Sequence, residues 1–370
     1  MVKRFLRKRG NAVIDREFVN RINEENIPLS GSLELTHRCN LSCRHCYQYA
    51  PSGEEMDLER WVKLMDELAA SGCLFLAFTG GEPLLREDAF GILEAAAERD
   101  FAITLQTNAT LLDRDKVRML GQMPTLRVDV SLYGIHPSTH DELTGVDGSY
   151  TAARRALDLL REEDIPTMLK VVVGSFNLDE VEEIAALADE LDTPAMFTSL
   201  IFPRNDRDPA PTRFRLDDEG LERFMRFELD YLPRYLSEVM DEKIDNLADY
   251  VQRCAIGPAD PGNEEKRYCG GGRTIFAINP HGDVYPCVAF PLVVGNIVEK
   301  EFVEIWRNSP ELLELRRKEM EIPSECGDCS YLDRCGICRA LSYQEQGEVV
   351  ALSEEKCRLT RTLMKVLDNA

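Results

Sequence analysis

The sequence of 370 residues has no long hydrophobic run. No apolar segment approaches the roughly 20 residues that a membrane-spanning helix needs, so we expect no transmembrane segment and no membrane partner. The basic first ten residues are not followed by an apolar stretch or a small-residue cleavage site, which argues against a secretory signal. We therefore expect a cytoplasmic protein.

The chain also lacks the excess of positive charge that nucleic-acid-binding proteins carry. It has 44 basic and 66 acidic side chains, which give a formal net charge of −22. Most of such a surface repels a phosphate backbone, so nucleic acid is excluded as the expected substrate or partner. The sequence shows no internal repeat and no low-complexity tract.

Cysteine, in contrast, is abundant, with 12 residues in the chain. Because the cytoplasm keeps thiols reduced, ligation of metal or of iron–sulfur clusters explains these residues better than disulfides do. Cys39, Cys43 and Cys46 form one tight group, and eight others lie between Cys254 and Cys357. Cys73 stands alone before an apolar strand and is interpreted as a small buried hydrophobic residue.

Between residues 31 and about 203, short apolar runs alternate with amphipathic helical stretches, the pattern of parallel βαβ units. Six such units predict an α/β fold with an open, TIM-like partial (β/α)6 barrel. The expected strands are Ser32–Thr36, Leu74–Thr79, Ala102–Thr107, Arg127–Leu132, Thr167–Val173 and Ala195–Ile201. The expected helices include Leu58–Ala70, Asp88–Arg99, Tyr150–Glu163 and Leu178–Leu191.

Polar motifs follow the predicted strands at their carboxyl ends, where the reactive groups of such barrels gather. Residues 39–46 follow the first strand, residues 80–83 the second and residues 107–108 the third, while Ser131 ends the fourth. The sequence therefore predicts one site at this end of the barrel.

The character of the chain changes after residue 203, where a loop rich in proline and charge precedes helical sequence. From Cys254 onward the periodicity fades, and Gly, Pro and Cys accumulate, as in small domains held together by metal. We expect an N-terminal extension (1–30), the barrel (31–215), a helical bridge (216–253) and a small cysteine-rich domain (254–370).

Cys39, Cys43 and Cys46 are spaced as Cys-x3-Cys-x2-Cys on one loop. Three thiolates can hold three irons of a cubane and leave the fourth iron open to a substrate-like molecule. A structural zinc site is the alternative, with His45 or His37 as fourth ligand.

With Tyr47 beside the last cysteine, this segment resembles the signature of the radical S-adenosylmethionine (SAM) superfamily. The resemblance spans the whole predicted barrel and implies a [4Fe–4S] cluster whose open iron is chelated by SAM. Electron transfer from the cluster would then yield methionine and a 5′-deoxyadenosyl radical. Gly80, Gly81, Glu82 and Pro83 match the second motif of the family, whose glycines permit close backbone approach and whose oxygens can accept bonds from an ammonium group. Alone, these four residues could also form a simple turn.

The resemblance further assigns SAM contacts to Gln106, Asn108, Ser131 and Lys170. If Ser131 faces the barrel lumen, strand alternation places Asp129 there as well, where it could position or deprotonate substrate. The alternative is a hydrogen-bonded internal aspartate without a chemical role. Many relatives have an Arg where this chain has Thr144, so carboxylate binding is expected to rest on Ser131 and Lys170.

The C-terminal cysteines resemble a SPASM domain, an extension that binds two auxiliary [4Fe–4S] clusters in relatives. The last cysteine pair departs from the family by one residue. The family pattern implies a first cluster on Cys269, Cys287 and Cys338 with Cys254 as fourth ligand, and a second on Cys326, Cys329, Cys335 and Cys357. A zinc ribbon is the alternative for the second group.

SPASM relatives mainly modify peptides and proteins. We therefore expect an oxidoreductase that forms a thioether or C–C crosslink, or a related oxidation, in a short precursor peptide. A separate leader-binding protein and a reductant such as flavodoxin or ferredoxin are expected partners. The alternatives are tetrapyrrole side-chain modification of the haem-pathway type, protein oxidation of the sulfatase-maturase type, and a non-catalytic electron carrier or sensor.

Overall fold

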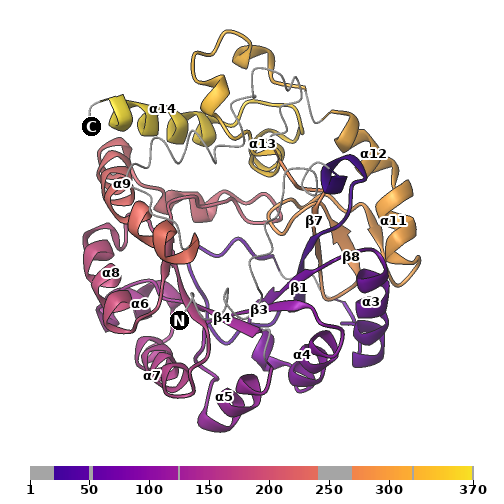
Figure 1. The fold of residues 1–370 in the computed structure, drawn as a ribbon. Helices are drawn as coiled ribbons and strands as arrows, with labels where there is room; N and C mark the ends of the chain where they lie inside the picture. The colour runs from indigo at the N-terminus through magenta and orange to yellow at the C-terminus, as the bar shows by residue number, and fades with distance from the viewer. Residues whose placement is uncertain (1–20, 50–52, 124–125, 241–268, 319–320, 369–370) are drawn as a thin grey trace.

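The computed structural model describes residues 21–49, 53–123, 126–240, 269–318 and 321–368. Within these residues the strands form one nine-stranded sheet in the order β6-β5-β4-β3-β2-β1-β7-β8-β9 (Figure 1). The first six strands are parallel and neighbour one another in chain order, as the partial barrel requires. They are β1 (Ser30–Thr36), β2 (Phe75–Gly80), β3 (Ala102–Thr107), β4 (Leu126–Ser131), β5 (Thr167–Val172) and β6 (Ala195–Thr198).

Helices connect these strands and surround them in Figure 1. They are α3 (Leu58–Ala70), α4 (Ala89–Ala97), α5 (Arg114–Gly121), α6 (Pro137–Thr144), α7 (Ser149–Glu162) and α8 (Val181–Glu190), with the short helices η1 (Pro83–Leu85) and η2 (Leu178–Glu180). Helix α3 shows how the sequence specifies them. Asp57 caps its start by accepting a bond from the Arg60 backbone, and Trp61, Leu64, Met65 and Leu68 form its buried face.

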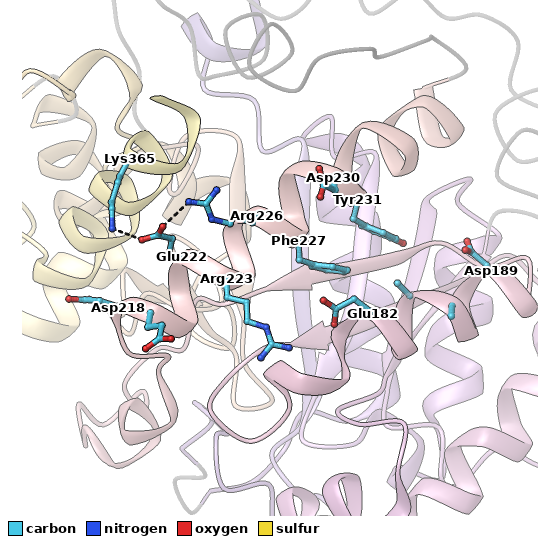
Figure 2. A pocket seen from close by; sticks show the side chains of 13 residues that line it. Glu182, Asp189, Asp218, Glu222, Arg223, Arg226, Phe227, Asp230, Tyr231 and Lys365 are labelled. Atoms are coloured by element: carbon cyan, nitrogen blue, oxygen red, sulfur yellow. Dashed lines mark hydrogen bonds and ion pairs between the residues drawn. The ribbon is translucent and has the colours of Figure 1, made fainter. Parts of the chain in front are cut away.

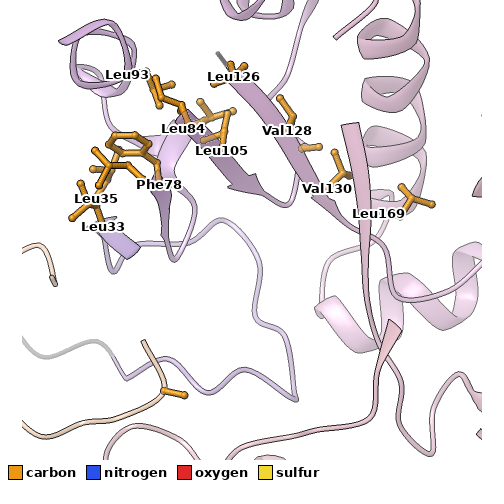
Figure 3. Packing of buried hydrophobic residues seen from close by; sticks show 14 of the residues in the cluster. Leu33, Leu35, Phe78, Leu84, Leu93, Leu105, Leu126, Val128, Val130 and Leu169 are labelled. Atoms are coloured by element: carbon orange, nitrogen blue, oxygen red, sulfur yellow. The ribbon is translucent and has the colours of Figure 1, made fainter. Parts of the chain in front are cut away.

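Alternation along the strands separates a hydrophobic core from the barrel lumen. One face of each strand packs into the core, to which β1 contributes Leu33 and Leu35, β2 Phe78, β4 Val128 and β5 Leu169 (Figure 3). The intervening residues therefore face the lumen. They include Glu34, Gln106, Asp129 and Lys170.

The cysteine-rich segment continues the barrel sheet, which the sequence did not predict. Strand β7 (Ile275–Ile278) pairs in parallel with β1, and β8 (Asp283–Tyr285) and β9 (Gly295–Asn296) follow antiparallel. These strands have only two to four residues, so they carry no periodic signal, and β7 pairs with a strand more than 200 residues earlier in the chain.

The remaining elements are α9 (Asp218–Met240), which matches the start of the predicted bridge, and α11 (Phe302–Asn308), α12 (Pro310–Arg317), α13 (Arg339–Gln346) and α14 (Glu354–Asp368), with the short helices η3 (Ala210–Phe214), η4 (Ser324–Cys326) and η5 (Leu332–Arg334). Helix α14 lies beside α9, where Arg358 pairs with Asp218 at 3.2 Å. No helix in the described part of the chain is long and apolar enough to cross a membrane.

The junction between β1 and β7 gives the first prediction. A Cβ atom at Gly31 would lie 2.3 Å from the Phe276 ring, which packs against Phe302 and is 1% exposed. We expect Gly31→Ala to lower the free energy of unfolding by about 1–3 kcal/mol through overpacking, measured by anaerobic denaturation. Gly121→Ala, at a helical position with no heavy atom within 4 Å, should not destabilise. Equal stability of the two variants would contradict this packing.

Candidate active site

The predicted cysteine triad lies on the loop that follows β1. Cys39 is exposed, and Cys43 and Cys46 are partly buried. Burial, followed by the charges of Cys46 and Cys39, raises the pKa of Cys43 to about 12, so the three sulfurs are neighbours. Such thiols ionise when a metal centre supplies positive charge, so the donor set fits an iron–sulfur cluster. No three His, Cys, Asp or Glu side chains in the described ranges converge on one metal ion, whereas thiolates of a cubane each bind a separate iron.

The Gly-Gly-Glu-Pro segment holds this loop in place. Backbone bonds run from Gly81 N–H to the Thr36 carbonyl at 2.8 Å and from Glu82 N–H to the Arg38 carbonyl at 2.9 Å. A Cβ at Gly81 would lie 2.3 Å from the Arg38 carbonyl oxygen, and Gly80 has φ +126°. The close approach that requires glycine is therefore an approach to the loop that carries Cys39.

The Glu82 carboxylate is held by hydrogen bonds from its own chain, and its predicted contact with SAM stays a prediction. It is completely buried and accepts hydrogen bonds from the Leu84 N–H (3.1 Å), the Thr107 hydroxyl (2.8 Å) and the Asn108 N–H (2.8 Å). Burial raises its pKa to about 6. These three donors all belong to the protein, so here Glu82 joins the ends of β2 and β3, and Pro83 begins η1 beside it.

Asn108 lies beside the first cysteine of the triad. Its amide donates to the Cys39 sulfur at 3.9 Å and to the Asn40 side chain at 2.9 Å, and the Leu41 N–H also approaches that sulfur at 3.4 Å. Donors of this kind favour the thiolate. The structure thus brings the third strand end to the cluster loop, as predicted.

The far side of the loop rests on the end of α6. The Ser42 N–H donates to the Thr144 carbonyl at 2.8 Å, and the Arg44 N–H donates to the Leu143 carbonyl at 2.9 Å. Thr144 is fully buried, and its hydroxyl bonds to Ser149 at 2.7 Å. Thr144 therefore supports the loop and, unlike an Arg at this position, carries no positive charge.

An aromatic cluster that the sequence analysis missed includes His45, which lies between Cys43 and Cys46 in the chain. The Tyr133 ring contacts His45 at 4.5 Å and His140 at 5.6 Å, and its hydroxyl interacts with Ser131. Burial lowers the pKa of both histidines to about 4, so they are neutral at pH 7. Tyr133 comes two residues after the fourth strand, so the strand-end rule used elsewhere could have found it.

Asp129 is 1% exposed and forms an ion pair with Arg127 at 2.8 Å on the same strand. Burial raises its pKa, while Arg127 and Lys170 lower it. Gln106 lies opposite Asp129 in the β3–β4 register, and Lys170 opposite Ser131 in the β4–β5 register. The lysine ammonium contacts the Met196 sulfur at 2.8 Å, and burial lowers its pKa. Asp129 thus resembles the internal, hydrogen-bonded alternative, and a role as base stays a prediction.

Glu34 is a second lumenal carboxylate, and the sequence analysis missed it. It is 4% exposed and accepts a bond from the Gln48 amide at 2.5 Å. Burial, and then the charges of Glu34 and Cys46, raise the pKa of Tyr47 well above its usual value, with a further contribution from Cys287. Tyr47 is therefore close to both cysteine regions. The alternation applied to Asp129 would have placed Glu34 in the lumen as well.

The C-terminal cysteines gather in the two groups that were predicted. Burial, and then the charges of Cys269 and Cys338, raise the pKa of Cys287 to about 12. In the other group, burial and then the charges of Cys357, Cys335 and Cys329 raise the pKa of Cys326. Cys254 lies outside the described residues, and Cys73 is 3% exposed, as expected for a buried hydrophobic residue.

A separate groove of about 980 Å³ lies between α8, α9 and the end of α14 (Figure 2). Its polar lining is largely paired, since Glu222 binds both Arg226 and Lys365. None of the predicted site residues lines it, so it is distinct from the cysteine sites.

Two families match the chain, the Radical SAM superfamily over residues 33–188 and SPASM, an iron–sulfur cluster-binding domain, over residues 269–330. The AdoMet-dependent heme synthase of Methanosarcina barkeri is 29% identical over 337 residues, which are 87% of this chain and 94% of that protein. The PqqA peptide cyclase of Bradyrhizobium diazoefficiens is 27% identical over 356 residues, 90% of this chain and 87% of that protein.

Solved structures show the same fold. Streptococcus suis SuiB bound to its precursor peptide SuiA has a TM-score of 0.69 at 18% identity, covering 92% of this chain and 79% of that one. The anSMEcpe protein with bound AdoMet has a TM-score of 0.70 at 19% identity, covering 92% of this chain and 97% of that one. The mixed α/β partial barrel with a cysteine-rich C-terminal region is therefore the fold of this chain.

The triad is tested by replacing Cys39, Cys43 and Cys46 with Ala. We expect cleavage of SAM to 5′-deoxyadenosine to be lost, because no thiolate remains to hold the irons of that cluster. Chromatography of anaerobic, reduced reaction mixtures measures the product. Cys73→Ala is the matched control and should cleave normally. Cleavage at the normal rate by the triple variant would contradict the assignment.

A second variant tests the contact between the glycine motif and the loop. Gly81→Ala requires the Arg38 backbone to move by roughly 1 Å, and a displacement of that size should reduce SAM cleavage about 100-fold. Gly91→Ala is the control, because its Cβ would meet only Leu58 methyl groups at 3.4 Å and 3.6 Å. Unchanged cleavage in Gly81→Ala would show that the loop tolerates this shift.

Proposed function

We propose, on the premise that this chain is an enzyme with a radical SAM domain and a SPASM domain, that it modifies a ribosomally made peptide or protein. Its radical SAM domain binds a [4Fe–4S] cluster and SAM, and its SPASM domain binds auxiliary iron–sulfur clusters. The proposed product is a thioether or C–C crosslink, or a related oxidation.

The bound cluster and SAM supply a 5′-deoxyadenosyl radical that abstracts hydrogen from substrate. We assign Cys39, Cys43 and Cys46 to that cluster. Asn108 would orient the Cys39 end of the loop by its amide, and Gly80 and Gly81 would keep the loop against β2. Tyr47, Gln106, Ser131 and Lys170 are the remaining proposed SAM contacts, and Asp129 is the proposed base once its pairing with Arg127 opens.

The peptide assignment rests mainly on the two groups of cysteines in the C-terminal region. They are Cys269, Cys287 and Cys338 in one group, and Cys326, Cys329, Cys335 and Cys357 in the other, with Cys254 proposed as a further ligand of the first. Auxiliary clusters can serve an oxidative crosslink by accepting an electron or by binding a substrate thiol. Similar proteins named as peptide cyclase, mycofactocin maturase and subtilosin biosynthesis protein support this assignment.

Modification of a tetrapyrrole is the second candidate, and two cationic side chains of the lumen favour it. Arg127 and Lys170 lie near Asp129 on this face of the sheet, and these two cations would suit the carboxylate side chains of such a substrate. Three similar proteins are named AdoMet-dependent heme synthase and one Fe-coproporphyrin III synthase. Protein oxidation of the sulfatase-maturase type is a variant of the first candidate.

We place the enzyme in the cytoplasm, with a short precursor peptide, a separate leader-binding protein and a reductant such as flavodoxin or ferredoxin as partners. The proposed division of the chain is an N-terminal extension, a barrel, a helical bridge and a SPASM domain.

The test offers both substrate classes to the anaerobically reconstituted enzyme with SAM and a reductant. One reaction contains a short peptide encoded beside the enzyme's gene, and the other contains iron coproporphyrin III. We expect the peptide to lose two hydrogen atoms per crosslink in the mass spectrum, together with formation of 5′-deoxyadenosine. The triple cysteine variant is the control. A mass change confined to the porphyrin would contradict the peptide assignment and favour the second candidate.

A further inference from the structure

Glu34 is a buried carboxylate for which the proposed chemistry has no use. Leu33 and Leu35, on either side of it, are 0% exposed in the core, so Glu34 points to the opposite face of β1. Among the described side chains, the His37 ring nitrogen lies 3.4 Å from its carboxyl group. A buried carboxylate is costly unless hydrogen bonds compensate it, so its bonds indicate what it does.

Those bonds reach both ends of the loop that carries the triad. One oxygen accepts from the Gln48 amide at 2.5 Å, and Gln48 lies two residues after Cys46. The other oxygen is 3.4 Å from the His37 ring nitrogen, and His37 lies two residues before Cys39. One carboxyl group thus joins the entry and the exit of the loop, with one oxygen at each end.

The same group of side chains touches the C-terminal region. The His37 ring meets the His281 ring edge-on at 5.4 Å, and His281 lies in the turn between β7 and β8. The His281 Nδ1 atom bonds to the Glu54 carbonyl at 3.0 Å. Strand β8 ends at Tyr285, two residues before Cys287. The contact therefore links the triad loop to the hairpin that leads to a second cysteine group.

This group of side chains also contains buried polar atoms that lack a hydrogen-bond partner. The Nδ1 atom of His37 and the Nε2 atom of His281 are buried without a hydrogen-bond partner in the described residues. Buried polar atoms are nearly always paired, and the exceptions concentrate at functional sites.

We propose that Glu34 is a positioning residue for the radical centre: it fixes both ends of the loop bearing Cys39, Cys43 and Cys46, and ties that loop through His37 to the β7–β8 hairpin. The proposal rests on the assignment of the triad to the SAM-binding cluster. It does not depend on whether the substrate is a peptide or a tetrapyrrole.

The test compares Glu34→Gln with the exchange variant Glu34→Gln/Gln48→Glu in the reconstituted holoenzyme, without substrate. The readout is the change that SAM causes in the electron paramagnetic resonance spectrum of the reduced protein, titrated to obtain the SAM affinity. We expect Glu34→Gln to weaken SAM binding about tenfold, because one oxygen acceptor becomes a donor facing the Gln48 amide. The exchange variant should recover most of that affinity, since the new amide at position 34 can accept from His37 and donate to the new carboxylate at position 48.

Hydrogen exchange reports the link to the hairpin. Amides of residues 279–285 should exchange faster in Glu34→Gln and return toward the wild-type rate in the exchange variant. Glu59→Gln, the same chemical change at an exposed position of α3, should leave both readouts unchanged.

Gln48→Met supplies an independent variant in case Glu34→Gln does not retain its iron–sulfur clusters. It removes the donor, keeps the carboxylate, and should also weaken SAM binding. Wild-type SAM affinity in both Glu34→Gln and Gln48→Met would overturn the proposal. An exchange variant no better than Glu34→Gln would overturn it as well. Because no substrate is present, these outcomes are independent of the proposed function.

Discussion

The site depends on one backbone contact, the approach of Gly81 to the residues that lead into the cysteine triad. The loop after β1 has little regular structure of its own, so neighbouring strand and helix ends must hold it. Hydrogen bonds at 2.8 Å and 2.9 Å join it to the end of β2, and two more join it to the end of α6. Because a side chain at Gly81 would occupy the space of the Arg38 carbonyl, the loop geometry is possible only with glycine there.

The barrel could be predicted from the sequence because its strands and helices follow local periodicity. The motifs could then be placed at the ends of the predicted strands. The bounds of all six parallel strands lie within three residues of those expected, and β3 and α3 match their expected ranges. The spacing of the cysteines carried the resemblance to known families, and that resemblance implied how the C-terminal cysteines divide into groups. Strands β7 to β9 could not be predicted, because two to four residues give no period and the pairing of β7 with β1 is set by tertiary contacts such as the Phe276 packing.

The roles of individual polar residues were harder to predict than their positions. A bond from an ammonium group to Glu82 stays a prediction, and the structure adds hydrogen bonds from Leu84, Thr107 and Asn108 that the sequence did not indicate. Asp129 was found in the lumen, but with Arg127 as its partner. Glu34 was missed, although it alternates with core residues on β1 in the same way that Asp129 does on β4. Some of these partners, such as Thr107 and Asn108 for Glu82, come from distant segments, which a single sequence does not specify.

The most direct test of the account is the content of iron, acid-labile sulfide and zinc per chain after anaerobic reconstitution. Three thiolate groups that each hold a cubane predict about twelve irons, a matching amount of sulfide and no stoichiometric zinc. About four irons with one or two zincs would contradict the account. The C-terminal region would then be a structural zinc module, and its cysteines would have no part in the chemistry.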